Sequence, residues 1–114
     1  MKTRDDVIKF CYTLPDIYID YPFDENWACI RCKKNKKAFV FAYQREGDIW
    51  INIKVSPEWT DFWRNAYEYV IPAYHMNKKH WNSVILNGTI PDEEIKRMIL
   101  ESYDLVKPKS RPIK

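Results

Sequence analysis

The segment "AFVFAYQREGDIWINIKV", residues 38–55, decides the fold class of this chain because its apolar residues recur at the spacing of strands. Two short apolar or alternating runs, 38–43 and 48–55, are separated by turn residues that include Gly47. Side chains alternate along a strand, so the second run has an aliphatic face and a mixed face. The aliphatic face, expected in the core, is Ile49, Ile51, Ile53 and Val55, and the mixed face, expected in solvent, is Trp50, Asn52 and Lys54.

Three further strands are predicted around this segment, which makes five in all. They are "WACIRC" (27–32), "VIPAYH" (70–75) and "HWNSVIL" (80–86). Pro72 weakens the second of these, and a turn around Asn77 and Lys78 joins it to the last strand. The proline- and acid-marked segment that follows Pro15 is expected to be a loop.

Three amphipathic helices are predicted from their start signals and from helical spacing. Thr3 and Asp6 form a capping-box pattern at the first start. Ser56 followed by Pro57 marks the second, and Pro91 followed by acidic residues marks the third. The expected apolar faces are Val7, Phe10, Cys11 and Leu14; Trp59, Phe62, Trp63, Ala66 and Tyr67; and Ile95, Met98, Ile99, Ser102 and Val106.

The resulting order, α-β-β-β-α-β-β-α, predicts an α+β fold. Helices pack on a five-stranded antiparallel sheet, which gives a two-layer sandwich. A chain of 114 residues has the size of one domain, and we assign residues 1–107 to it. Residues 108–114 hold two prolines and no apolar pattern, so we expect a flexible basic tail that can be removed without loss of folding.

Composition and the N-terminal residues predict a cytoplasmic protein. No run approaches the roughly 20 apolar residues of a membrane helix, so no membrane partner is expected. The opening "MKTRDDVIKF" lacks the apolar region of a secretory signal, and three cysteines without such a signal predict reduced thiols. The net charge of +3 is too small to indicate a nucleic-acid partner, but its distribution is uneven.

Basic residues gather at two expected hairpin turns, in "RCKKNKK" and "NKKH". Lysines on projecting turns are placed to meet phosphates without reading bases, so the turns can act as two basic wings on a duplex. The candidate nucleic-acid-binding residues are Lys33, Lys34, Lys36, Lys37, Lys54, His75, Asn77, Lys78, Lys79 and His80. The alternative is a pair of solvated turns that keep the sheet edge soluble.

The cysteines and histidines predict no metal site and no cofactor. Cys29 and Cys32 offer a zinc ligand set with His75 and His80 only superficially. An offset of three residues on one strand puts the two thiols on opposite faces, and the gap to the histidines far exceeds zinc-finger spacing. A structural hairpin, with Trp81 buried as an anchor and His75 hydrogen-bonded in the core, remains open beside a binding role.

Several segments together resemble the MmcQ/YjbR family over nearly the whole chain. They are "YPF", "KKAFVFAY", "SPEW", "PAYHMNKKHWNSVIL" and "SYDLV". The resemblance implies a two-layer α/β sandwich related to secretion-chaperone-like folds, and a DNA-binding protein of the double-wing type. One departure is that Lys36 and Lys37 precede Ala38 where the family pattern has glycine and lysine.

We therefore expect a non-enzymatic DNA-binding protein of low sequence specificity. The first alternative is a protein-interaction module, in which the outer aromatic residues or a sheet edge receives a partner segment. The second alternative is an enzyme that uses His75 or His80, although no nucleophile, base and orienting group are recognisable beside them. The sequence leaves the oligomeric state open.

Overall fold

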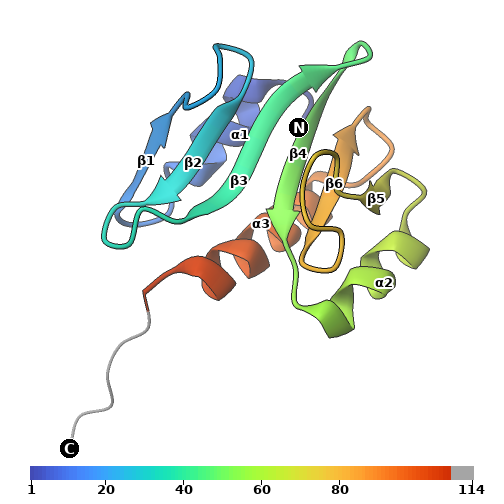
Figure 1. Ribbon diagram of the computed structural model, residues 1–114. Coiled ribbons are helices and arrows are strands. Elements are labelled where there is room, and N and C mark those ends of the chain that lie inside the picture. Colours follow the sequence, from blue (N-terminus) through green and yellow to red (C-terminus); the bar gives the residue numbers. More distant parts are fainter. Residues whose placement is uncertain (109–114) are drawn as a thin grey trace, which may run out of the picture.

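A computed structural model describes residues 1–108 of the protein and contains three helices and six strands in that range (Figure 1). The elements are α1 (Arg4–Cys11), β1 (Ile17–Asp20), β2 (Ala28–Cys32), β3 (Ala38–Arg45), β4 (Asp48–Lys54), α2 (Pro57–Ala66), β5 (Val70–Pro72), β6 (Trp81–Leu86) and α3 (Asp92–Val106). The mixed composition confirms the predicted α+β class.

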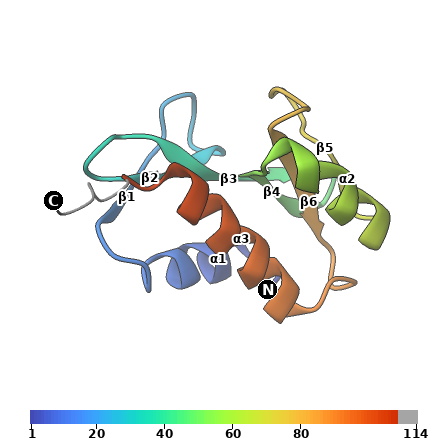
Figure 2. The same ribbon diagram turned by 90° about the horizontal axis from the view of Figure 1, so that it is seen from below.

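The six strands form one sheet in the order β1-β2-β3-β4-β6-β5, and each neighbouring pair is antiparallel. Helices α1 and α3 lie against one face of this sheet, which we call the helix face, while α2 lies beside β5 and β6 (Figure 2). The other face carries no helix within residues 1–108. Loops 21–27 and 73–80 rise from it instead, so we call it the loop face (Figure 2).

The sheet has one strand more than the five predicted. The additional strand is β1, which lies in the segment that the sequence predicts to be a loop, and it pairs with β2 at the edge of the sheet. Ile17 and Ile19 turn into the core, and the Asp20 carboxylate accepts a hydrogen bond from Arg31 Nε at 2.9 Å. A segment of four residues close to a proline is too short to show the alternation of apolar and polar residues by which a strand is recognised in a sequence. This strand is defined instead by its pairing with β2.

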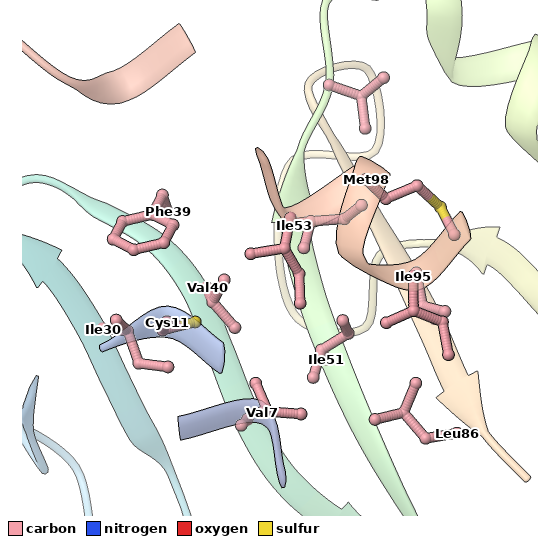
Figure 3. Packing of buried hydrophobic residues seen from close by; sticks show 14 of the residues in the cluster. Val7, Cys11, Ile30, Phe39, Val40, Ile51, Ile53, Leu86, Ile95 and Met98 are labelled. Carbon is pink, nitrogen blue, oxygen red and sulfur yellow. The ribbon is translucent and has the colours of Figure 1, made fainter. Parts of the chain in front are cut away.

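A β-bulge in β3 shapes the core on the helix face. Ile30 pairs with Val40 and Arg31 pairs with Ala38, which leaves Phe39 as an extra residue. Consecutive residues of a regular strand point to opposite faces, but here Phe39 and Val40 both belong to the core (Figure 3). The Phe39 ring meets the edge of Tyr103 on α3, with ring centroids 5.1 Å apart.

The helix predictions are confirmed for α1 and α3 and only partly for α2. The capping box of α1 is formed by Thr3 and Asp6, and the five residues of the expected α3 face are all buried. On α2, Trp63 is buried, whereas Trp59 and Phe62 are 49% and 48% exposed. The reason is that α2 covers only the β5 and β6 edge of the sheet, which is too narrow to bury its whole apolar stripe.

The mixed face of β4 is not in solvent, contrary to the prediction. Trp50 is only 6% exposed and Asn52 is fully buried. The expected aliphatic face does contribute Ile51, Ile53 and Val55 to the core. The prediction failed because loop 73–80 folds over the other face: the carbonyl oxygen of Tyr74 accepts a hydrogen bond from Asn52 Nδ2 at 2.9 Å.

The sequence also predicts a C-terminal tail and no membrane-spanning helix. The predicted tail, residues 108–114, lies outside the described residues except for Pro108. Within residues 1–108, no helix combines the length and the apolar character that crossing a bilayer requires. The removability of the tail remains a prediction.

Ser102 of α3 provides a test of how the helix is joined to the sheet. Its fully buried hydroxyl accepts a hydrogen bond from the Lys54 backbone N–H at 2.8 Å and donates one to the Phe39 carbonyl at 2.6 Å. Ser102→Ala leaves both backbone groups without this partner, so we expect a loss of about 2–4 kcal/mol in the free energy of unfolding, measured with urea. Ser56→Ala is the matched control, because the Ser56 side chain makes no capping hydrogen bond. A Ser102→Ala midpoint equal to that of the control would contradict this role.

Candidate functional site

The two predicted basic turns emerge at the same end of the sheet. At this end β2 and β4 finish and β3 and β6 begin, with Lys54 paired to Trp81 in the register of β4 and β6. In the strand order, the turn between β2 and β3 is about two and a half strand spacings from β6. At a spacing of about 4.8 Å between strands, this offset is roughly 12 Å across the sheet. We call this the basic end of the sheet.

The turn at residues 33–37 has a fixed backbone and free side chains. The Cys32 N–H donates to the Lys37 carbonyl at 3.0 Å, and Asn35 Nδ2 donates to the Val106 carbonyl of α3 at 2.8 Å. Lys36 adopts φ +61°, the left-handed conformation that favours glycine. The present chain places a charged side chain at this position. Four lysine side chains of the turn are exposed: Lys33, Lys34, Lys36 and Lys37.

The loop at residues 73–80 is held by hydrogen bonds within the loop and by hydrogen bonds from α2. Lys78 Nζ donates to the Ala73 carbonyl at 2.9 Å, and Asn77 Oδ1 accepts from the Lys79 N–H at 2.9 Å. Arg64 of α2 donates to the Lys78 carbonyl and, through Nε, to Asn82 Oδ1 at 2.6 Å. Lys78 and Lys79 are nevertheless exposed, so the loop presents its charge on an ordered backbone.

Seven of the ten predicted residues lie at the basic end of the sheet. The other three have different surroundings. The seven are Lys33, Lys34, Lys36, Lys37, Lys54, Lys78 and Lys79. Asn77 acts as a turn residue within the loop, and His80 is half-buried where the loop enters β6. His75 lies on the loop face rather than in the core, and it is exposed, so the hydrogen-bonded core histidine was a wrong interpretation.

Aromatic side chains cover the loop face, which the sequence did not predict. Trp27 stacks on Tyr43 with ring centroids 3.8 Å apart and an interplanar angle of 11°. Phe41 meets the edge of Trp27 at 6.3 Å and that of Trp81 at 5.7 Å, and Trp81 is only half-buried. The sequence signal was the alternation of Phe41 and Tyr43 with small aliphatic residues, which places both rings on one face.

A buried hydrogen-bond network joins the loop face to the sheet. Asn52 Oδ1 accepts from the Tyr43 hydroxyl at 2.7 Å and from Ser83 Oγ at 2.5 Å. Asn52 Nδ2 donates to the Tyr74 carbonyl, and the Tyr74 N–H donates to Ser83 Oγ at 2.8 Å. We call Tyr43, Asn52 and Ser83 the polar triad; each is at most 1% exposed. Burial raises the pKa of Tyr43 to about 12, so its hydroxyl keeps the donated proton at neutral pH.

Arg45 places a cation beside the aromatic rings of the loop face. Its guanidinium carbon lies 4.2 Å from the ring centroid of Tyr74 and 4.7 Å from that of Trp50. Arg45 also forms an ion pair with Glu46 at 2.8 Å. Cation–π contacts of this kind stabilise the rings and hold Tyr74 toward the sheet.

The cysteines are placed as small core residues. Cys32 belongs to the core on the helix face, whereas Cys29 lies next to Asp20 and Arg31 on the other side of β2, as the strand offset predicts. Burial raises the pKa of Cys11 to about 12 and is the main reason why that of Cys29 rises to about 11. Across residues 1–108, no three His, Cys, Asp or Glu side chains gather in an arrangement that holds a metal ion.

Comparisons with known proteins agree with this fold along nearly the whole chain. The model of the YjbR family matches residues 12–105. The uncharacterized protein YyaQ of Bacillus subtilis (strain 168) is 35% identical over 119 residues, which cover 94% of this chain and 100% of YyaQ. A crystal structure of the Deinococcus radiodurans protein DR2400, which carries the domain DUF419, has a TM-score of 0.85 at 30% identity, over 92% of this chain and 78% of that one.

A solution NMR structure of a Pseudomonas syringae protein is also similar, with a TM-score of 0.80 at 28% identity over 97% of this chain and 98% of that one. These likenesses define the class as an α+β domain of the YjbR and DUF419 type, built on an antiparallel sheet with helices on one face. The chain belongs to the YjbR family. The resemblance stated from its sequence motifs is thereby confirmed.

Asn52→Ala tests whether the polar triad holds loop 73–80. The change leaves the Tyr74 carbonyl and the Tyr43 hydroxyl without their buried partner, and we expect a loss of about 2–4 kcal/mol in the free energy of unfolding. Because the loop is released locally, trypsin should also cleave at Lys78 and Lys79 faster than in the wild type. Asn65→Ala, at an exposed position of α2, is the matched control and should change neither quantity. Unchanged cleavage in Asn52→Ala would contradict the assigned role.

Proposed function

We propose that the protein binds DNA with little sequence specificity through phosphate contacts at the basic end of the sheet. The observation that carries the proposal is a set of six exposed lysines on two ordered turns at that end. They are Lys33, Lys34, Lys36, Lys37, Lys78 and Lys79. Within residues 1–108 none of them forms an ion pair with a carboxylate, although Lys78 Nζ donates a hydrogen bond to the Ala73 carbonyl at 2.9 Å. A phosphate therefore competes with no carboxylate for these six charges.

The spacing of the two turns suits a double-stranded ligand. The offset of roughly 12 Å between the strands that carry them is comparable to the width of about 12 Å of the major groove of B-DNA. Two basic segments at this distance can each contact phosphates that flank one groove. Lysine contacts to phosphates position a protein on the duplex and carry no base information, which is why we propose low specificity.

Acidic residues lie at both ends of the sheet. Loop 21–27 and the first turn of α3 lie at the other end of the sheet, where they carry Asp24, Glu25, Asp92, Glu93 and Glu94. Near the basic end, Asp104 is paired with Lys107 at 3.0 Å. Cations also lie at that other end, among them Lys96 and Arg97, and Asp16 lies beside the turn at residues 33–37, where its carbonyl accepts a hydrogen bond from the Lys33 N–H at 2.8 Å. The clustering of six lysines, and not a separation of charge along the strands, is what attracts a polyanion to the basic end.

We also propose that the protein is not an enzyme. Acid–base or nucleophilic catalysis needs a base within reach of a nucleophile and a third group that orients the base. His75 is exposed with its ring against Tyr74 at 4.0 Å, and His80 is half-buried at the start of β6. Neither position supplies such a set.

A protein-interaction module is the second candidate, and one feature of α2 favours it. A groove of about 250 Å³ runs between α2, α3 and the end of β4, and its lining includes Trp59, Trp63 and Leu105. Trp59 is 49% and Leu105 is 42% exposed, so an apolar partner segment would bury both. This groove adjoins the basic end, because Lys54 is in its lining, but it contains none of the six lysines of the two turns. Substitution of those lysines therefore distinguishes the two candidates.

The quadruple change Lys34→Gln, Lys36→Gln, Lys78→Gln and Lys79→Gln tests the proposed function. If each lysine neutralises about one phosphate, the four supply a slope of roughly −3.6 in log K against log salt. This slope corresponds to about a hundredfold weakening between 50 and 200 mM salt. We expect the variant to bind duplex DNA more weakly than the wild type at low salt and to lose most of this slope. Both changes should be the same for all DNA sequences, as measured by fluorescence anisotropy.

The matched control changes four cations at the other end of the molecule, Lys2, Lys9, Lys96 and Arg97, to Gln. It removes the same net charge, so a non-specific charge effect would weaken both variants equally. Circular dichroism should show the helical content of the wild type in each. The proposed function fails if the wild type binds no duplex at low salt, or if the folded quadruple variant keeps the wild-type slope.

A further inference from the structure

A pocket of about 430 Å³ opens on the loop face, away from the lysines of the turn between β2 and β3. Its walls come from loop 21–27 on one side and loop 73–80 on the other, with β3 between them (Figure 2). The lining residues are Phe23, Asp24, Trp27, Phe41, His75 and Met76. The volume and the largely aromatic lining with few polar groups are typical of sites that bind small ligands or parts of larger ones.

The wall formed by loop 21–27 is held rigidly although it is exposed. Arg4 of α1 donates from one terminal nitrogen to the carbonyls of Glu25 and Asn26, at 2.8 and 2.9 Å. The Asn26 side chain bonds both backbone groups of Gln44, with its Nδ2 donating at 3.0 Å and its Oδ1 accepting at 3.0 Å. These contacts place Phe23, which is 69% exposed, beside Trp27 with ring centroids 6.2 Å apart.

The opposite wall is held by the polar triad. Both backbone groups of Tyr74 are bonded to buried side chains of the sheet, at 2.8 and 2.9 Å. The next residue, His75, has φ +59°, a left-handed conformation that is strained for a residue with a side chain. Asp16, Lys36 and Glu46 share this conformation at other turns, so at His75 it marks a turn, and this turn places the imidazole in the lining of the pocket.

The exposed carboxylate of Asp24 leaves one oxygen accessible to a ligand in this pocket. Asp24 Oδ1 accepts from the N–H groups of Asn26 and Trp27, at 2.9 and 3.2 Å. Within residues 1–108, Asp24 Oδ2 accepts no hydrogen bond and the carboxylate forms no ion pair. Asp24 is exposed, so water hydrates this oxygen until a ligand displaces it. An ionised carboxylate is an acceptor only, so a ligand group that replaces this water has to be a donor, such as an N–H group.

We propose that this pocket binds an unpaired nucleobase that carries an exocyclic amino group, within a single-stranded segment of DNA. The base would stack on the aromatic lining and donate its amino group to Asp24 Oδ2. Loop 73–80 provides His75 and Met76 to the pocket and Lys78 and Lys79 to the basic end, so one loop can contact a base and the adjoining phosphates. The inference rests on the proposed function, because it assigns the pocket to the same nucleic-acid ligand.

Phe23→Ala tests the stacking contact, with Phe62→Ala of α2 as the matched control, since both rings are exposed and only the first lines the pocket. The probe is a short single strand of deoxyadenylate with one 2-aminopurine, whose fluorescence falls on stacking. We expect wild type and Phe62→Ala to quench it equally, and Phe23→Ala to bind it roughly tenfold more weakly with less quenching. Duplex affinity should not change in either variant.

Asp24→Asn tests the amino-group contact by a change of preference. Asparagine keeps an oxygen for the turn contacts to Asn26 and Trp27 and replaces the free oxygen by an N–H₂ donor. Wild type should prefer deoxyadenylate and deoxycytidylate over deoxythymidylate, whereas the variant should lose or reverse this preference. A role of Asp24 in folding alone would lower all affinities alike and leave the order unchanged.

The outcomes separate the pocket from the basic end. If duplex binding depends on the four lysines while Phe23→Ala and Asp24→Asn bind single strands as the wild type does, the proposed function stands and the pocket assignment is overturned. If adenosine monophosphate binds as tightly as the oligomer, the pocket serves a free nucleotide and the single-strand assignment is overturned. If the lysine change alters nothing but the two pocket variants behave as expected, the proposed function fails and the base pocket stands.

Discussion

The hydrogen bonds of Asn52 with Tyr43, Ser83 and Tyr74 are the constraint on which the loop face depends. A buried amide that satisfies both its oxygen and its nitrogen fixes the side chains around it, because any shift leaves a polar group unpaired in a low dielectric. Through Tyr74 this constraint holds loop 73–80 across β4 and β6. It thereby buries Trp50, shapes one wall of the aromatic pocket and returns Lys78 and Lys79 to the basic end.

The two faces of the sheet are therefore stabilised by different physical means. The helix face is an aliphatic core that α1 and α3 close, and the bulge at Phe39 increases the apolar area that β3 gives to it (Figure 3). The loop face is polar and aromatic, with stacked rings above a buried hydrogen-bond network. Stability comes mainly from the first face, and the second presents ordered loops with free lysines and an open pocket, a division that suits a binding protein.

Features set by local spacing could be predicted from the sequence, whereas those set by pairing between distant segments could not. The capping box at Thr3, the five-residue face of α3 and the alternation of β4 all follow from short-range patterns. The strand at Ile17, the burial of Trp50 and the exposure of Trp59 depend on what packs against each segment, which no local pattern records. The lysines were found because they cluster in the sequence; the aromatic pocket was missed because its walls lie about fifty residues apart.

We propose that nucleic acid binds to the loop face and the basic end, and not to the groove between α2 and α3. The indole N–H signals of the five tryptophans report on these surfaces separately in a ¹⁵N-labelled sample, because Trp27 lines the pocket and Trp59 and Trp63 line the groove. On titration with single-stranded DNA, we expect the signals of the Trp27 indole and of the amides of residues 33–37 and 78–79 to shift together, while the signal of the Trp59 indole stays in place. Shifts confined to Trp59 and Trp63, or no shift at saturating DNA, would contradict it.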